Sequence, residues 1–213
     1  MSMPRPNKVT CPKCGKEIGF TLWESINTEM DFAIPDIISG KLFEVTCDGC
    51  GFTTHIVYPM LFNDMIHHVM IYFSPNLEGL DTGEMGFFKD IGYKTRFVAE
   101  QADLREKTAI FNAGLDDRVV EIAKVFLRAQ LEAEMEDKNI GQIYLNISDD
   151  GYEWEVVVDG KPGFLEAPDE LFDELTEKVL PSLPSAKEEP FVIDSAWAMD
   201  FVMNSQDFSE DEE

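Results

Sequence analysis

The sequence is short of positive charge and of histidine. It has 17 lysines and arginines against 42 aspartates and glutamates, which gives a formal net charge of −25, and it has 3 histidines. Such a balance repels the phosphate backbone of nucleic acids and the anionic headgroups of lipids. We therefore expect no nonspecific binding to nucleic acid or to a membrane surface.

Long hydrophobic runs are also missing. The first eight residues contain no apolar stretch of the roughly 7 to 15 residues that a secretory signal needs. No segment approaches the roughly 18 apolar residues of a membrane-spanning helix. Thiols in a reducing compartment bind metal or do redox work more often than they form structural disulfides. We expect a cytoplasmic, soluble protein whose 4 cysteines are reduced.

All four cysteines lie in two CxxCG motifs, Cys11-Pro12-Lys13-Cys14-Gly15 and Cys47-Asp48-Gly49-Cys50-Gly51. Each motif can present two thiolates from one tight turn, and the final glycine can adopt the positive φ that the turn requires. Two such turns together place four sulfurs around a tetrahedral zinc ion at about 2.3 Å. Four protein ligands leave no open position for a reactive water. The sequence therefore predicts one structural Zn²⁺ on Cys11, Cys14, Cys47 and Cys50.

The motifs are separated by 32 residues, more than the roughly 15 to 20 of a common zinc ribbon. An insertion must fill the gap, and residues 30–40, with Pro35 near the start and Gly40 as a stop, predict a short helix there. Redox cycling between dithiol and disulfide is the alternative use of the motifs. Iron in a four-sulfur site is a further, less common alternative. A catalytic CxxC normally opens a helix, whereas both motifs here lie between predicted strands, so zinc is preferred.

Hydrophobic patterns predict the secondary structure around the motifs. Alternating or β-branched residues indicate strands over residues 18–23, 52–58 and 69–73. Four glycines within residues 76–92 indicate a loop or linker.

Helical periodicity follows this loop. Residues 104–115 predict one helix, and residues 117–131 predict a second that begins at an N-cap, so an antiparallel helix pair is expected. The Asp149-Asp150-Gly151 turn lies between two alternating runs and predicts a β-hairpin. Residues 168–179 predict an amphipathic helix with acidic residues at its positive end.

Charge divides the chain into three parts. Residues 1–75 carry 5 basic and 8 acidic residues, residues 76–138 carry 9 and 14, and residues 139–213 carry 3 and 20. The cysteines and the acidity thus belong to different regions. We expect a zinc-ribbon region over 1–75, a loop and helix pair over 76–138 that completes this domain, and an acidic α/β region over 139–213 with a disordered tail from Asp207.

Several short motifs accompany the cysteine pairs, namely Ser25-Ile26-Asn27, Ser39-Gly40, Tyr58-Pro59, Asn63-Asp64 and Gly114-Leu115-Asp116-Asp117-Arg118. Together with Cys11-Pro12-Lys13-Cys14, they resemble the CpXC domain family of bacterial and archaeal proteins over about residues 9–130. The second cysteine motif departs from the family pattern because Asp48 occupies the usual proline position, which leaves all four ligands in place. The resemblance implies the paired-cysteine module and no particular reaction.

Other polar and aromatic residues have ordinary structural explanations. His55 and the His67-His68 pair near Asp64 suggest a second metal site, but their spacing matches no standard site, and we expect structural roles. Arg118 is expected to form a local ion pair at a helix N-terminus. An aromatic group could stack bases, but without a basic groove we expect core packing. This group comprises Trp23, Tyr58, Phe62, Tyr72 and Phe73.

These observations predict an α+β protein with an N-terminal zinc ribbon of antiparallel strands, a central helical pair and a C-terminal β-hairpin with helices. The sequence contains no phosphate loop, nucleophile elbow or HExxH motif, so we expect that the protein is not an enzyme. The expected function is non-catalytic, with zinc supporting a platform that binds other proteins, basic ones included. The alternatives are a thiol-redox or metal-responsive sensor, and an acidic inhibitor or nucleic-acid mimic that covers a basic protein.

Overall fold

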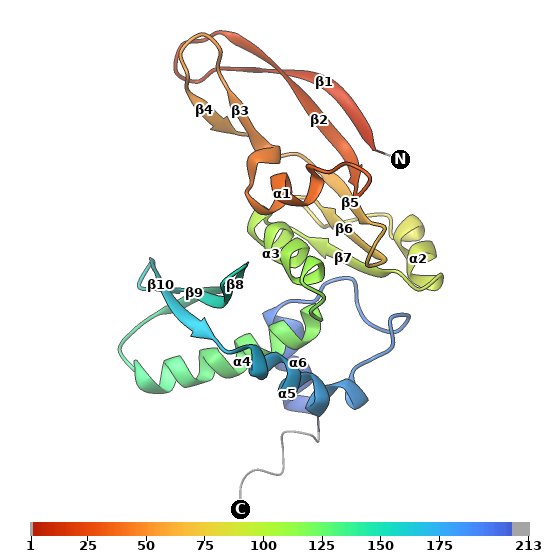
Figure 1. The fold of residues 1–213 in the computed structure, drawn as a ribbon, viewed down its shortest axis with the longest axis vertical. Helices are drawn as coiled ribbons and strands as arrows, with labels where there is room; N and C mark the ends of the chain where they lie inside the picture. Colours follow the sequence, from red (N-terminus) through yellow and green to blue (C-terminus); the bar gives the residue numbers. More distant parts are fainter. Residues whose placement is uncertain (1, 206–213) are drawn as a thin grey trace, which may run out of the picture. The chain divides into compact units, whose positions relative to one another are not determined.

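A computed structural model describes residues 2–205 of the chain, which divides into two units, Met1–Thr108 and Ala109–Glu213 (Figure 1). The described residues combine helices and strands in an α+β arrangement, as the sequence predicted. The division falls inside α3 (Gln101–Asn112). The three-part division expected from charge places boundaries elsewhere and stays a prediction about domains. The tail expected from Asp207 lies outside the described residues.

The first unit is built on a five-stranded sheet with the order β1-β2-β5-β6-β7. The pairs β1–β2 and β5–β6 are antiparallel, whereas β2–β5 and β6–β7 are parallel. The penultimate strand β6 is buried almost throughout, as its unbroken apolar sequence favours. The strands span Met3–Thr10 (β1), Glu17–Asn27 (β2), Met60–Asp64 (β5), Val69–Phe73 (β6) and Lys94–Val98 (β7).

β1 and the first part of β2 form a two-stranded ribbon. β2 pairs with β5 only from Ser25 to Asn27, so its preceding residues pair with β1 alone (Figure 1). The sequence pattern indicates β2 but not β1, because Pro4 and Pro6 disfavour a strand. Proline is tolerated at a sheet edge, where its missing N–H breaks no ladder, and there it also hinders pairing with another chain.

A short second hairpin carries the other cysteine motif. β3 (Glu44–Thr46) and β4 (Thr53–His55) pair antiparallel on either side of it. The strand predicted over 52–58 is present but ends at His55. The insertion contains α1 (Ala33–Ile38) and a 3₁₀ turn, η1 (Lys41–Phe43), with Gly40 at φ 77° between them, so the predicted short helix and its glycine stop are confirmed.

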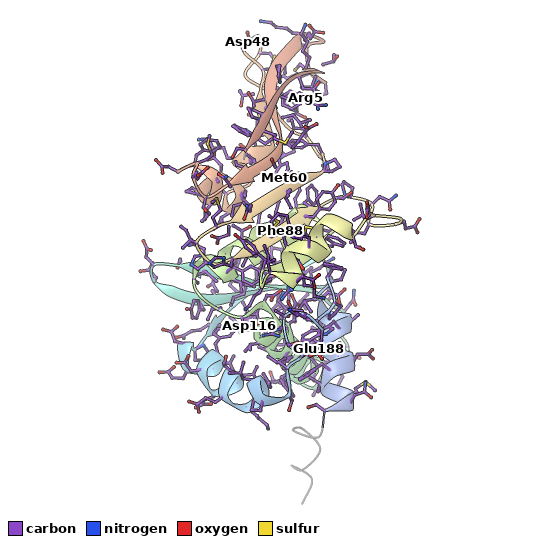
Figure 2. The ribbon with its side chains drawn as sticks, turned by 90° about the vertical axis from the view of Figure 1, so that its right-hand side faces the viewer. Arg5, Asp48, Met60, Phe88, Asp116 and Glu188 are labelled. Carbon is purple, nitrogen blue, oxygen red and sulfur yellow. The ribbon has the colours of Figure 1, made fainter. Side chains whose placement is uncertain are left out.

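The loop predicted over residues 76–92 is wrong in part. It contains α2 (Gly83–Asp90), which packs against β7, a strand that the sequence also failed to indicate. The ring of Phe88 lies 5.6 Å from that of Tyr93, just before β7 (Figure 2). The glycines in this helix lower its intrinsic propensity. Tertiary contacts of the aromatic residues therefore determine its conformation.

The second unit contains a three-stranded antiparallel sheet with the order β10-β9-β8. β8 (Ile140–Ser148) and β9 (Gly151–Val158) form the predicted hairpin around Asp149 and Asp150. The third strand, β10 (Lys161–Ala167), was not predicted. It follows a tight turn in which Asp159 and Gly160 both have positive φ, at 50° and 77°, the geometry that an Asp-Gly hairpin turn requires.

Helices α4 (Asp117–Glu134) and α5 (Asp169–Val179) pack on one face of this sheet, and α6 (Ser195–Asn204) packs against α4. The sequence predicted that α4 would pair antiparallel with the preceding helix. The main packing partners of α4 are instead β8, α5 and α6. The core is centred on Phe172 of α5, whose ring lies 5.2 Å from that of Tyr152 and 5.7 Å from that of Trp154. A 3₁₀ turn, η2 (Leu180–Ser182), follows α5.

No helix within residues 2–205 has both the length and the apolar character needed to cross a bilayer.

Candidate metal centre

The two cysteine motifs form the same turn at the ends of two hairpins. In the first, the Cys11 amide donates to the Lys16 carbonyl at 2.8 Å, and the Gly15 amide donates to the Cys11 carbonyl at 2.9 Å. The second repeats this pattern from Cys47 to Phe52, with both bonds at 2.8 Å. Gly15 and Gly51 have φ of 74° and 68°, so the glycine that closes each turn is required by its conformation.

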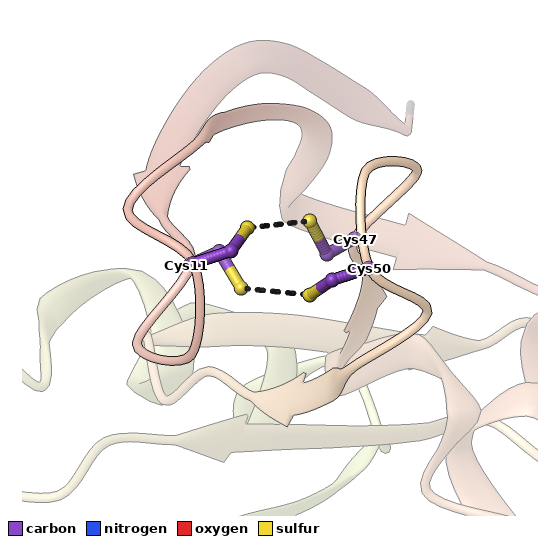
Figure 3. Close-up of side chains that lie close together, drawn as sticks. Cys11, Cys47 and Cys50 are labelled. Carbon is purple, nitrogen blue, oxygen red and sulfur yellow. Dashed lines mark hydrogen bonds between the residues drawn. The ribbon is translucent and has the colours of Figure 1, made fainter.

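These turns bring all four sulfurs together (Figure 3). The Sγ atoms of Cys11 and Cys50 are 3.7 Å apart, as are those of Cys14 and Cys47, and all four lie within 4.8 Å of one another. A disulfide requires about 2.05 Å, so these thiols are unbonded. Four ligands at about 2.3 Å from a tetrahedral metal would be separated by about 3.8 Å. The predicted tetrad is thus assembled with the spacing that a metal needs.

The four sulfur ligands limit which metal ions the site could bind. Thiolates are soft ligands that suit zinc, iron and Cu(I), whereas calcium and magnesium prefer oxygen. The four cysteines therefore fit the predicted zinc ion, and they also fit the iron that was considered beside it.

Burial around the tetrad is limited. Cys11 and Cys47 are 1% exposed, Cys50 is half-buried and Cys14 is exposed. The buried cluster here consists of the two buried cysteines with Ile18 and Val45, and a few partly buried side chains pack against it. Two of the four cysteines therefore remain at least partly accessible to solvent. The small cluster provides little of the apolar surface that would hold the two turns together without another interaction.

Thiols this close compete for protons. Burial is the largest effect on Cys11 and raises its pKa, but amides of Cys14 and Lys13 and the neighbouring thiols together outweigh it and lower the pKa to about 7. At Cys50 the amide of Phe52 lowers the pKa, but burial and the other three thiols raise it to about 12. Deprotonation of one thiol thus opposes that of the next. A cation among the four sulfurs would relieve this repulsion.

A salt bridge joins the two turns. The Lys16 ammonium lies 2.9 Å from the carboxylate of Asp48, a residue labelled at the top of Figure 2. Asp48 raises the pKa of Lys16, and nearby Cys47 and Cys14 raise it further; Lys16 in turn lowers the pKa of Asp48. In the sequence, Asp48 departs from the family pattern without indicating a role. Its partner is 32 positions away, and only the assembled turns bring the two together.

The histidines do not form a second metal centre. Among residues 2–205, the four cysteines are the only group of three or more potential ligands close enough to share an ion. The Nδ1 atom of His67 lies 2.6 Å from the Asp64 carboxylate, which also accepts bonds from the amides of Ile66 and His67 and so shapes the turn after β5. His55 lies 3.7 Å from Glu44 on the paired strand. Both histidines thus have partners within the protein, and their purely structural role stays a prediction.

Most of the aromatic group also has a structural role. Tyr58, Phe62 and Phe73 are buried in the core of the first unit, as expected, while Trp23 and Tyr72 are half-buried.

Arg118 is a helix-capping ion-pair residue with a further partner. Its guanidinium donates to both carboxylate oxygens of Asp116, at 2.9 and 2.7 Å, and the Asp116 side chain caps α4 by accepting from the Arg118 amide. This confirms the local interpretation. The guanidinium also donates to the Pro184 carbonyl at 2.7 Å and lies 3.2 Å from the buried carboxylate of Glu189. The sequence gave no signal for these last contacts because they join segments about 70 residues apart.

Comparison with known proteins gives one match. A family model described as "CpXC protein" matches residues 9–124, more than half of the chain, including both cysteine motifs and the start of α4. This agrees with the span of the resemblance seen in the sequence. No curated protein and no solved structure matches the chain.

Proposed function

The chain belongs to the CpXC family, and from this premise we propose that it is a non-catalytic, cytoplasmic protein in which one structural zinc ion supports a surface that binds other proteins. The observation that supports the zinc assignment is the cluster of four sulfurs, with its two 3.7 Å separations between the two turns and all four atoms within 4.8 Å of one another. Four thiolates fill the coordination of zinc and leave no position for a water or a substrate. The metal would therefore hold the turns and take no part in a reaction.

The small cluster of buried residues around the sulfurs supports the same role. Zinc binding to sites of this kind is worth on the order of 10 to 16 kcal/mol, which is as large as the whole stability of a typical domain. The long β1–β2 ribbon ends at the first turn, so the ion would fix the end of that ribbon against the β3–β4 hairpin.

Metal analysis tests this proposal. The full chain is purified without added metal, and its zinc and iron contents, native mass and thiol reactivity are measured before and after chelation. One zinc per chain with four protected thiols is the expected result. Iron in place of zinc would change the metal assignment alone. Metal-free protein with freely reactive thiols would overturn the proposal.

A second candidate function is a thiol-redox sensor, favoured by the exposure of Cys14. Two pairs of sulfurs from different turns lie 3.7 Å apart, so oxidation would join Cys11 to Cys50 and Cys14 to Cys47. Each disulfide would form when two thiols give two electrons and two protons to hydrogen peroxide, which becomes two waters. Mass spectrometric mapping after mild peroxide treatment separates the candidates. Reversible disulfides between the two turns with zinc release would favour the sensor, and inert thiols would exclude it.

A further inference from the structure

The second unit contains an apolar groove of about 420 Å³ between α4, α5 and the strand β10. Eight of the ten residues that line it are apolar. Three of these, Phe126 of α4, Leu165 of β10 and Leu171 of α5, are also among the exposed large hydrophobic residues. Single exposed apolar residues are common, but a contiguous apolar hollow marks a binding surface.

The register of the sheet shows why this groove is unusual. Leu165 pairs directly with Trp154 of β9, so the two side chains lie on the same face of the sheet. Trp154 is 2% exposed because the helices cover it, whereas Leu165 is 42% exposed. The helical layer therefore ends before the edge strand. A core-facing position is left open at the place where the groove lies.

Charge around the groove indicates the chemistry of what would cover it. α5, which forms one wall, exposes five carboxylates and a single lysine along 11 residues. Glu166 adds a carboxylate to the lining. These acidic side chains repel acidic segments and attract cationic ones. The chain's own final residues 206–213 carry five acidic residues and no basic ones, so they lack the charge that fits the groove.

The form of the ligand follows from the edge strand. Pro162 in β10 has no N–H, which removes a donor from the strand and disfavours the addition of another strand at this edge. An apolar hollow between two helices instead suits side chains spaced along one face of a helix, at positions i, i+3, i+4 and i+7. We propose that this groove binds a basic amphipathic helix of a partner protein. The proposal specifies the partner surface of the binding function proposed above and rests on it.

A model peptide tests the groove in the full, metal-loaded chain. The probe is a fluorescent 15-residue peptide of leucine and lysine with leucines at helical spacing, and the control peptide has the same composition with leucine and lysine alternating. Fluorescence anisotropy at physiological salt should show saturable binding of one helical peptide per chain. The alternating peptide should bind at least about tenfold more weakly, because its apolar residues cannot enter the groove along one face.

Neighbouring residues of β10 provide matched variants. Leu165→Gln should weaken binding of the helical peptide by about tenfold, as loss of an apolar anchor does. Phe164→Gln, a similar change on the opposite face of the same strand, should alter it by no more than about twofold. Phe164 is 56% exposed and does not line the groove. Leu171→Gln on α5 repeats the test from the other wall, so the result does not depend on the folding of one variant.

Several outcomes would overturn the inference. Absence of binding would do so, and equal affinity for the two peptides or equal weakening by Leu165→Gln and Phe164→Gln would show that the acidic surface acts without the groove. A third contradictory result concerns a chain that lacks residues 206–213. The inference would be wrong if this chain bound the helical peptide more strongly and no groove variant abolished that binding. Zinc is measured in the same samples. One zinc per chain without peptide binding contradicts the groove alone, whereas a metal-free chain contradicts the proposed zinc function whatever the peptide does.

Discussion

The cysteine turns and the core of the second unit are held together by different means. Around the sulfurs, the buried cluster comprises Ile18, Val45 and two of the cysteines themselves. In the second unit the buried side chains come from α4, all three strands, α5 and α6, and they include large residues such as Trp154 and Phe172. The first region has too little apolar surface to fold by burial, whereas the second has ample surface for it.

The two regions carry different kinds of sequence signal. A metal site concentrates its information in a few reactive residues at short spacing. A hydrophobic core distributes it over many residues that are individually replaceable. The two regions should accordingly respond to different perturbations, and experiments can test whether the contrast holds.

Metal removal should have the largest effect, and it should be confined to the first region. Chelation, or Cys47→Ser, removes an interaction worth on the order of 10 to 16 kcal/mol in comparable sites. We expect the amides of both cysteine turns and of β3 and β4 to lose protection in hydrogen exchange. The amides of β9 serve as the internal control and should keep theirs. Unfolding of β9 upon chelation would show that the metal stabilises both regions, and the proposed difference between the cysteine turns and the core of the second unit would be wrong.

Truncation of the central aromatic residue should give the next largest effect, in the second region. Phe172→Ala removes a fully buried ring in contact with Tyr152 and Trp154, and such changes cost about 3 to 5 kcal/mol. Hydrogen exchange of β9 should accelerate accordingly while the metal content of the chain stays unchanged. Leu171→Ala, at the exposed adjacent position, is the matched control and should cost less than about 1 kcal/mol. Similar losses from both variants would contradict the packing described for α5.

The cysteine tetrad was predictable because its ligands, its turns and its glycines are all local in sequence. Gly15 and Gly51 lie where the turn geometry requires positive φ, and the short helix of the insertion ends at Ile38, just before Gly40, as its sequence indicated. The Lys16–Asp48 bridge was not predictable, because each residue belongs to a different cysteine turn and the two meet only when the turns are assembled.

Edge elements were missed for a different reason. β1 and β10 contain proline, and β10 contains Gly163 as well, so their intrinsic preference argues against a strand. Pairing with β2 and β9 overrides this preference. α6 was missed because its apolar sequence lacks clear periodicity. Its one usable signal was Asp194, whose side chain caps the helix by accepting from the Trp197 amide at 2.9 Å.

A smaller effect is expected from the ion pair that fixes the start of α4. Arg118→Gln leaves the buried Glu189 carboxylate without the guanidinium 3.2 Å away and removes the donor to the Pro184 carbonyl. Breaking a buried pair from one side costs about 3 kcal/mol. Arg118→Lys keeps the charge but loses the paired bonds to Asp116, so an intermediate loss is expected. Hydrogen exchange of α4 and β9 measures both. A loss from Arg118→Lys equal to that from Arg118→Gln would show that geometry, and not charge, dominates.

The smallest effect should come from the exposed turn between β9 and β10, and it should depend on pH. The Asp159 carboxylate accepts from the Lys138 ammonium at 2.7 Å and from the Asn139 amide at 3.1 Å, and these bonds, with the Lys138 bond first, lower the pKa of Asp159. A carboxyl group whose folded pKa lies below its unfolded value of about 3.9 adds stability that is complete above that value. This stability is lost as pH falls through the folded pKa.

Asp159→Asn tests this contribution while keeping the backbone, because asparagine tolerates the positive φ found at this position. The variant should be slightly less stable than the natural chain at neutral pH, and the difference should shrink as the solution is acidified below about pH 4. Denaturant midpoints at several pH values measure it, with Asp150→Asn in the other turn of the meander as a control for the change in net charge. If the difference instead stays constant down to pH 2, the ionised carboxylate is not its source. The small loss of stability would then come from the altered shape of the turn between β9 and β10, and not from the charge of Asp159.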